Sequence, residues 1–129
     1  NFLSKLLRYP KLIDVENSIS HLGDFVRASL ESVDKKVPFG VYNMTNPGGV
    51  TTRHVCDILS EHAFPDRRFE FFDNGQESLK ALSLVPRSNC VLNADKLRAT
   101  GITMRPVDEA LIEAAKGLAS RCSKQEALR

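Results

Sequence analysis

Arg87 is the side chain whose type and setting most strongly suggest binding chemistry. It follows Pro86 within Val85–Asn93, a stretch whose pattern predicts an extended link between two elements. A guanidinium in such a place can donate two parallel charge-assisted hydrogen bonds to a phosphate. An ion pair with Asp95 or Glu70 explains the same residue equally well. The sequence therefore predicts either an anion-binding arginine or a structural ion pair here.

The other residue types that perform chemistry do not occur at the spacings that their reactions need. The three histidines, at positions 21, 54 and 62, form neither H-x-x-x-H nor H-E-x-x-H, so we expect no metal site. No G-x-S-x-G motif offers a nucleophilic serine. Cys56 lies beside Val55 on a predicted helix, where a small buried core residue is the expected role. We assign no catalytic and no metal-binding residue.

Composition excludes several classes of partner. The chain has 129 residues and a formal net charge of +2, with basic and acidic residues mixed along it, which argues against nucleic acid and against a membrane surface. Its apolar runs are far shorter than the ~20 residues that cross a bilayer. Three widely spaced cysteines without a C-x-x-C pair favour a reducing compartment, so we expect a cytoplasmic protein.

The stretch from Val37 to Leu59 predicts a strand, a turn and a helix. Phe39, Val41 and Met44 have the weight of a buried strand, and Asn46–Gly49 interrupts it. Thr51 or Thr52 can then cap the helix. Such a corner can leave amide groups free to bind an anion, although a plain connection is the alternative, because no glycine-rich phosphate fingerprint is present.

Hydrophobic periodicity predicts a small α/β domain. Apolar residues recur at helical spacing in five stretches, and shorter apolar stretches predict strands. We expect helices near 1–8, 21–34, 52–63, 94–100 and from 106 to about 120, with a short helical turn within 76–84. We expect strands at 12–15, 37–44 and 67–73. We expect about four helices and short parallel strands in a mixed domain. So few strands, and a first residue other than methionine, suggest that 1–129 is one domain of a larger two-lobed protein.

Four segments together give the chain a family resemblance. It resembles the C-terminal, substrate-binding part of extended short-chain dehydrogenase/reductases of the nucleotide-sugar epimerase/dehydratase family, and within them the dTDP-4-dehydrorhamnose reductase branch. The segments that carry the resemblance are Glu16–Asp24, Gly40–Val50, Val85–Asn89 with Leu92–Leu97, and Arg105–Leu111. Their order and spacing match over nearly the whole chain.

The resemblance implies a substrate-side portion of a Rossmann-type protein involved in rhamnose biosynthesis. In relatives, the arginine equivalent to Arg87 reaches the diphosphate of a nucleotide-diphosphate sugar. Asn17 and Ser18 stand in a stretch from which relatives also contact the substrate. The partners implied are the sugar nucleotide and an N-terminal Rossmann lobe, with a homodimer left open, and NAD or NADP is expected in the parent protein.

Two features of that family are missing from the sequence. The chain has no glycine-rich dinucleotide loop, and neither Tyr9 nor Tyr42 has a lysine four residues later to complete a Tyr-x-x-x-Lys pair. We therefore expect no cofactor-binding residue and no activity in the isolated chain. The alternative is a non-catalytic interaction or regulatory module of the same fold. The sugar, the nucleotide and the choice among reduction, epimerisation and dehydration stay open.

Overall fold

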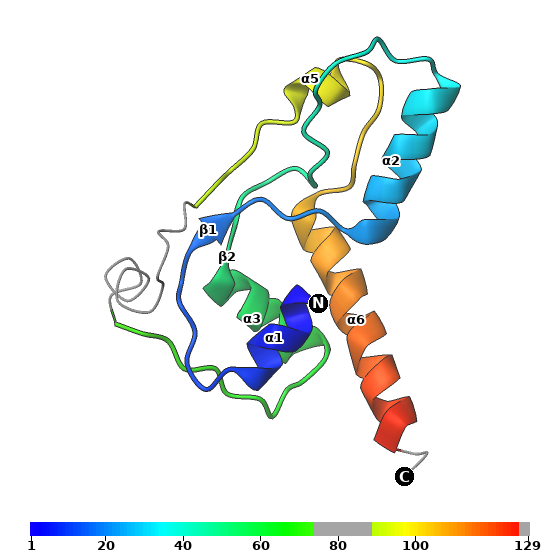
Figure 1. The fold of residues 1–129 in the computed structure, drawn as a ribbon. Helices are drawn as coiled ribbons and strands as arrows, with labels where there is room; N and C mark the ends of the chain where they lie inside the picture. Colours follow the sequence, from blue (N-terminus) through cyan, green and yellow to red (C-terminus); the bar gives the residue numbers. More distant parts are fainter. Residues whose placement is uncertain (74–88, 127–129) are drawn as a thin grey trace.

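The computed structural model describes residues 1–73 and 89–126. They form five helices and one two-stranded sheet (Figure 1), in the order α1 (Phe2–Arg8), β1 (Glu16–Asn17), α2 (Leu22–Asp34), β2 (Val50–Thr51), α3 (Thr52–His62), α5 (Asp95–Arg98) and α6 (Val107–Glu126). The small mixed α/β class is as expected, with one helix more than the four predicted. No helix within the described ranges combines the length and the apolarity that a membrane span requires.

The larger hydrophobic core joins α1, α3 and α6. Helix α3 packs along α6, and α1 adds its buried leucines to the same core (Figure 1). Each helix turns an apolar stripe toward this core, because residues three and four apart share a helix face. The buried members include Leu3 and Leu6 from α1, Val55, Ile58 and Leu59 from α3, and Val107, Leu111, Ala115 and Leu118 from α6. Cys56 is buried among them, as predicted.

A second, smaller core lies at the other end of the molecule. It joins α2, α5 and the segments that follow each of them, in the upper part of Figure 1. Its buried residues are Ala28, Leu97, Ile102 and Met104, with Val37, Tyr42 and Met44 packed against them. Because α2 contributes only a small alanine to it, this core depends mainly on the two connecting segments.

The strand predictions were mostly wrong. Residues 37–44 contain no strand, and Phe39 and Val41 are exposed instead of buried. The first strand is Glu16–Asn17 instead of 12–15, and it pairs antiparallel with β2, so that Glu16 lies opposite Thr51. Parallel pairing occurs within the described residues only at an isolated bridge between Leu12 and Phe71.

The helix predictions agree much better with the structure. Helices α2 and α3 begin and end within one or two residues of the predicted bounds, and α6 begins directly after Pro106. The C-terminal helix continues to Glu126, whereas its predicted end was at about residue 120. The predicted short helical turn within 76–84 lies outside the described residues.

Candidate functional site

Asn17 and Ser18 hold the chain segment that follows the region of Arg87. The Ser18 backbone N–H donates to the Cys90 carbonyl at 2.9 Å, and the Cys90 N–H donates to Oδ1 of Asn17 at 2.9 Å. The Leu92 N–H donates to Oγ of Ser18 at 2.8 Å. We call these three hydrogen bonds the clamp. They fix the path of residues 90–92 beside β1.

The clamp is supported by the small sheet and by the 44–46 segment. Pairing of β1 with β2 places Asn17 opposite Val50, whose side chain is buried in the larger core. Just after β1, the hydroxyl of Ser20 donates to the Met44 carbonyl at 2.7 Å, and the Asn46 N–H donates to the Ile19 carbonyl at 3.0 Å. Pairing with β2 and the hydrogen bonds to residues 44 and 46 therefore give residues 16–20 a fixed position.

Arg87 lies outside the described residues, so its contacts stay a prediction. Both predicted ion-pair partners of Arg87, Asp95 and Glu70, lie within the residues that the structure describes. The carboxylate of Asp95 pairs with Arg98 at 2.8 Å, and Glu70 belongs to the segment that follows α3.

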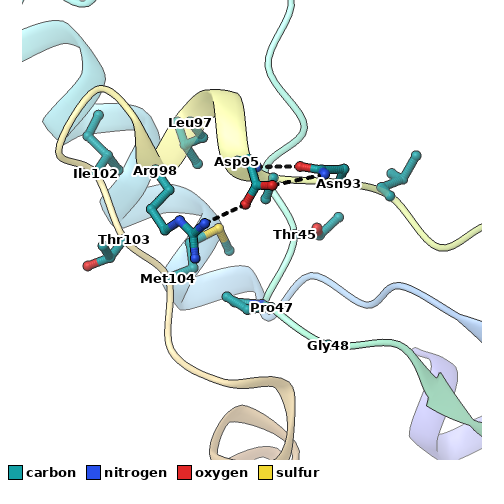
Figure 2. Close-up of a pocket in the computed structure, with 12 residues that line it drawn as sticks. Thr45, Pro47, Gly48, Asn93, Asp95, Leu97, Arg98, Ile102, Thr103 and Met104 are labelled. Carbon is teal, nitrogen blue, oxygen red and sulfur yellow. Dashed lines mark hydrogen bonds and ion pairs between the residues drawn. The ribbon is translucent and has the colours of Figure 1, made fainter.

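A pocket of about 260 Å³ adjoins the clamp at Leu92 and Asn93 (Figure 2). The turn at Thr45–Gly48, α5 and residues 102–104 form its walls. Leu97, Ile102 and Met104 make one side apolar, and Asn93, Asp95 and Arg98 supply the polar groups. A concave site with an apolar wall and a few placed polar groups is the usual form of a small-molecule site.

The polar groups of this pocket are organised by their own hydrogen bonds (Figure 2). The side-chain amide of Asn93 donates to Asp95 at 3.0 Å, and Oδ1 of Asn93 accepts from the Asp95 N–H at 2.6 Å. Asp95 in turn pairs with Arg98, whose side chain is largely exposed and whose guanidinium has further donors to offer. The pocket can therefore bind and orient a polar ring-sized group.

A buried ion pair at the start of α2 connects three segments. Asp24, at the start of α2, is only 5% exposed, and its Oδ1 accepts from Nε of Arg105 at 3.0 Å. Its Oδ2 accepts from the side-chain amide of Asn46 at 2.7 Å, and the same amide donates to the Arg105 carbonyl at 2.9 Å. Burial raises the pKa of Asp24, but the hydrogen bonds from Arg105 and Asn46, with the charges of Arg105 and His21, outweigh it and hold that pKa below 3.8.

Sequence reasoning did not single out these three residues. Asp24 is the last residue of one segment that carried the family resemblance, and Arg105 is the first residue of another. Asn46 lies within a third. A charged residue within the apolar pattern of a helix was the only local signal available. The interaction joins positions 24, 46 and 105, which are too far apart in sequence for periodicity to pair them.

The anion site considered at the start of α3 is not formed. The Arg53 N–H donates to Oδ1 of Asp14 at 2.9 Å, and the His54 N–H donates to Oγ1 of Thr51 at 3.1 Å. The Thr52 N–H is taken by the Val15 carbonyl at 3.1 Å. With its first amides occupied and a carboxylate beside them, this helix start repels an anion. The alternative of a plain connection is the correct one, and Thr51 is the cap.

Among the residues that the structure describes, no group of three or more His, Cys, Asp or Glu side chains could hold a metal ion. The Pro47–Gly49 turn before α3 is the nearest approach to a phosphate loop, and the helix amides behind it are engaged as above. The expectation that this chain holds no cofactor-binding residue stays a prediction.

Comparison with known proteins relates the chain to parts of longer enzymes. No protein-family model matches it. It is 31% identical over 113 residues to the bifunctional dTDP-4-dehydrorhamnose 3,5-epimerase/dTDP-4-dehydrorhamnose reductase of Arabidopsis thaliana, covering 88% of this chain and 36% of that protein. It is 29% identical over 117 residues to the trifunctional UDP-glucose 4,6-dehydratase/UDP-4-keto-6-deoxy-D-glucose 3,5-epimerase/UDP-4-keto-L-rhamnose-reductase RHM1 of the same plant, covering 91% of this chain and 17% of that protein.

A solved structure shares the fold. The L780 UDP-rhamnose synthase from Acanthamoeba polyphaga mimivirus superposes with a TM-score of 0.80 at 24% identity, covering 90% of this chain and 39% of that chain. The chain thus spans less than two-fifths of the length of each of these relatives.

Proposed function

Because the chain is homologous to the C-terminal part of dTDP-4-dehydrorhamnose reductase and of the trifunctional plant rhamnose enzymes, we propose that it binds the nucleotide-diphosphate sugar for an NAD(P)-dependent reductase or epimerase. The homology supports the nucleotide-sugar reductase/epimerase family as a whole. Rhamnose formation, a cytoplasmic location and the Rossmann-type parent fold are parts of the proposal.

The clamp is the observation that carries this proposal. Asn17 and Ser18, two of the three predicted site residues, use their polar side chains to fix the backbone at Cys90 and Leu92. Arg87 stands three residues before that fixed point in the sequence. We assign the diphosphate contact to Arg87, and to Asn17 and Ser18 the task of holding the substrate side of the site in place.

The chain contributes binding and orientation in this scheme. Arg87 donates parallel hydrogen bonds to the diphosphate, as a guanidinium does to phosphate oxygens. The pocket beside the clamp receives a ring of the ligand, with Asn93 and Arg98 as its polar groups. NAD or NADP, bound by a Rossmann lobe, supplies hydride chemistry. The acid/base pair belongs to that lobe as well, so the chain alone is inactive.

Calorimetric titration with UDP-sugars and dTDP-sugars tests the proposal. We expect Arg87→Ala to weaken binding by about 10- to 100-fold, because hydrogen bonds to charged groups contribute about 1.5–3 kcal/mol. Arg68→Ala is the matched control, since Arg68 is exposed and remote in sequence, and should leave the affinity unchanged. Equal affinity of the Arg87→Ala variant and the parent protein would remove the assigned role.

Ser18→Ala probes the clamp separately. This variant loses the acceptor of the Leu92 N–H. We expect about a tenfold loss of sugar-nucleotide affinity with little change in melting temperature, because the exposed amide can bond to water instead. An unchanged affinity would show that the clamp does not position the site.

The exposed apolar face of α2 favours a second candidate, a non-catalytic interaction or regulatory module. Leu22, Leu30 and Val33 are all more than 60% exposed, and surfaces of this kind promote association. This candidate predicts concentration-dependent self-association, including a homodimer, without sugar-nucleotide binding. Static light scattering together with the titration separates the two candidates.

A further inference from the structure

Glu16 carries a carboxylate beside the clamp. It directly precedes Asn17, whose Oδ1 accepts from the Cys90 N–H, and its side chain is exposed. A β-carbon added to Gly49 would lie only 2.5 Å from Oε1 of Glu16 and 3.2 Å from Cγ2 of Val91. The carboxylate and the Val91 side chain thus converge on the same glycine. The carboxylate therefore lies next to the segment that the clamp fixes.

The oxygens of this carboxylate are open to a ligand. Within the described ranges, no hydrogen bond and no ion pair engages the Glu16 side chain. Two other carboxylates of this region are engaged. Asp14 binds both the N–H and the side chain of Arg53. Asp95 pairs with Arg98. Glu16 differs from them, because both of its oxygens can still accept hydrogen bonds from a bound molecule.

The proposed position of the diphosphate brings the nucleoside of the ligand close to Glu16. This inference rests on the proposed function, which assigns the diphosphate to Arg87. Arg87 precedes Cys90 by three residues, and three residues of extended chain span at most ~11 Å. In a nucleoside diphosphate the ribose is joined to the phosphate through its 5′-carbon, and the 2′- and 3′-hydroxyls project from the opposite edge of the ring. The diol can therefore meet Glu16 while the phosphates stay clear of its negative charge.

We propose that the carboxylate of Glu16 accepts hydrogen bonds from the ribose 2′- and 3′-hydroxyls of the nucleotide-diphosphate sugar. The two oxygens of a carboxylate match the two donors of a vicinal diol, and hydrogen bonds to an ionised group are about twice as strong as those between neutral groups. A site that hydrogen-bonds a substrate hydroxyl rejects the analogue that lacks it. Glu16 therefore selects ribonucleotide sugars over their 2′-deoxy counterparts.

Gly49 gives the carboxylate the room to lie there. An alanine at this position would bring its methyl group against Oε1 of Glu16, and the flexible glutamate side chain would swing aside. Gly49→Ala thus keeps the charge but moves it. Glu16→Gln keeps the shape of the side chain but removes the charge and one of the two acceptor oxygens. The two variants disturb the same contact in independent ways.

Calorimetric titration of the chain with UDP-glucose and with dUDP-glucose tests the assignment, because these ligands differ only in the 2′-hydroxyl. The parent protein should bind UDP-glucose about tenfold more tightly, as expected for one hydrogen bond to a charged group. Glu16→Gln and Gly49→Ala should each reduce this preference to about twofold or less. Two matched controls should keep it: Glu109→Gln removes an exposed carboxylate on α6, and Gly117→Ala adds a methyl group where no atom lies within 4 Å.

The two proposals fail in different ways. Equal affinity of the parent protein for both ligands would overturn the role of Glu16 and leave the proposed function standing. So would a tenfold preference that survives Glu16→Gln, or a preference that Glu109→Gln also abolishes. Absence of binding to either ligand refutes the proposed function, and the role of Glu16 is then refuted with it. Glu16→Gln changes only an exposed side chain, so it decides the matter even if Gly49→Ala does not fold.

Discussion

Replacing Asp24 with asparagine tests the buried ion pair. The two carboxylate oxygens accept hydrogen bonds from Arg105 on one side and from Asn46 on the other. Asparagine keeps the shape but has one oxygen and one amide group, so one of the two donors must face another donor. Loss of the charge weakens the remaining contact as well.

The expected magnitude follows from these contacts. A hydrogen bond to a charged group contributes about 1.5–3 kcal/mol, and a buried donor left without a partner costs about 1–3 kcal/mol. Because Arg105 can reach water and recover part of this loss, we expect Asp24→Asn to lower the free energy of unfolding by about 2–4 kcal/mol. For a domain of this size, that amounts to a drop in melting temperature on the order of 10 °C.

The pH dependence gives the sharper test. The pKa of Asp24 is held below its ordinary value of 3.8 in the folded protein. A lowered carboxyl pKa stabilises the fold above the unfolded pKa, and that contribution disappears as the pH falls through the folded pKa. The stability difference between the parent protein and Asp24→Asn should therefore be full at pH 7 and shrink below about pH 4.

Urea unfolding followed by circular dichroism at pH 7 and at pH 3 measures both quantities. Asp34→Asn is the matched control, because Asp34 lies on the same helix but is exposed, and it should change stability by less than about 0.5 kcal/mol. The reasoning is refuted if Asp24→Asn matches this control at pH 7, or if its deficit stays the same at both pH values.

Three further predictions concern α3 and its surroundings. Thr51→Ala should lower the free energy of unfolding by about 1 kcal/mol, because the hydroxyl caps the His54 N–H; Thr51→Ser should restore it in thermal melts. Leu59→Ala should lower it by about 2–5 kcal/mol in urea titrations, since Leu59 is fully buried and leaves a cavity; a loss below 1 kcal/mol would contradict the packing described. Burial, followed by the charges of Asp57 and Asp14, raises the pKa of the Cys56 thiol to about 12, so a thiol reagent should label the exposed Cys90 in the native protein and reach Cys56 only after unfolding.

Helices were predictable from the sequence because their determinants are local. The spacing of Val55, Ile58 and Leu59, and the hydroxyl of Thr51 ahead of them, specified α3 almost to the residue. The same holds for the start of α6 after Pro106. Capping, periodicity and proline act within one or two turns, so none of the three requires knowledge of the rest of the molecule.

Strands were not predictable in the same way, because a strand exists only with a partner. Residues 37–44 have strand composition, yet none of the N–H groups from Val41 to Met44 donates a hydrogen bond within the described residues, and the apolar side chains of Phe39 and Val41 are exposed. Glu16–Asn17 lies just beyond the strand predicted at 12–15, and it is a strand because Val50–Thr51 lies opposite to it. Pairing between distant segments decided both outcomes.

The candidate site also has some features that local sequence specifies and others that depend on distant segments. The sequence by itself determined the helices, the buried role of Cys56 and the family resemblance that drew attention to Asn17, Ser18 and Arg87. Only the tertiary structure decided that Asn17 and Ser18 grip residues 90–92 and that the amides at the start of α3 are already taken. Helix formation and capping depend on residues that are close in sequence, whereas hydrogen bonds and ion pairs between distant segments form only when the folded chain brings their atoms within about 3 Å.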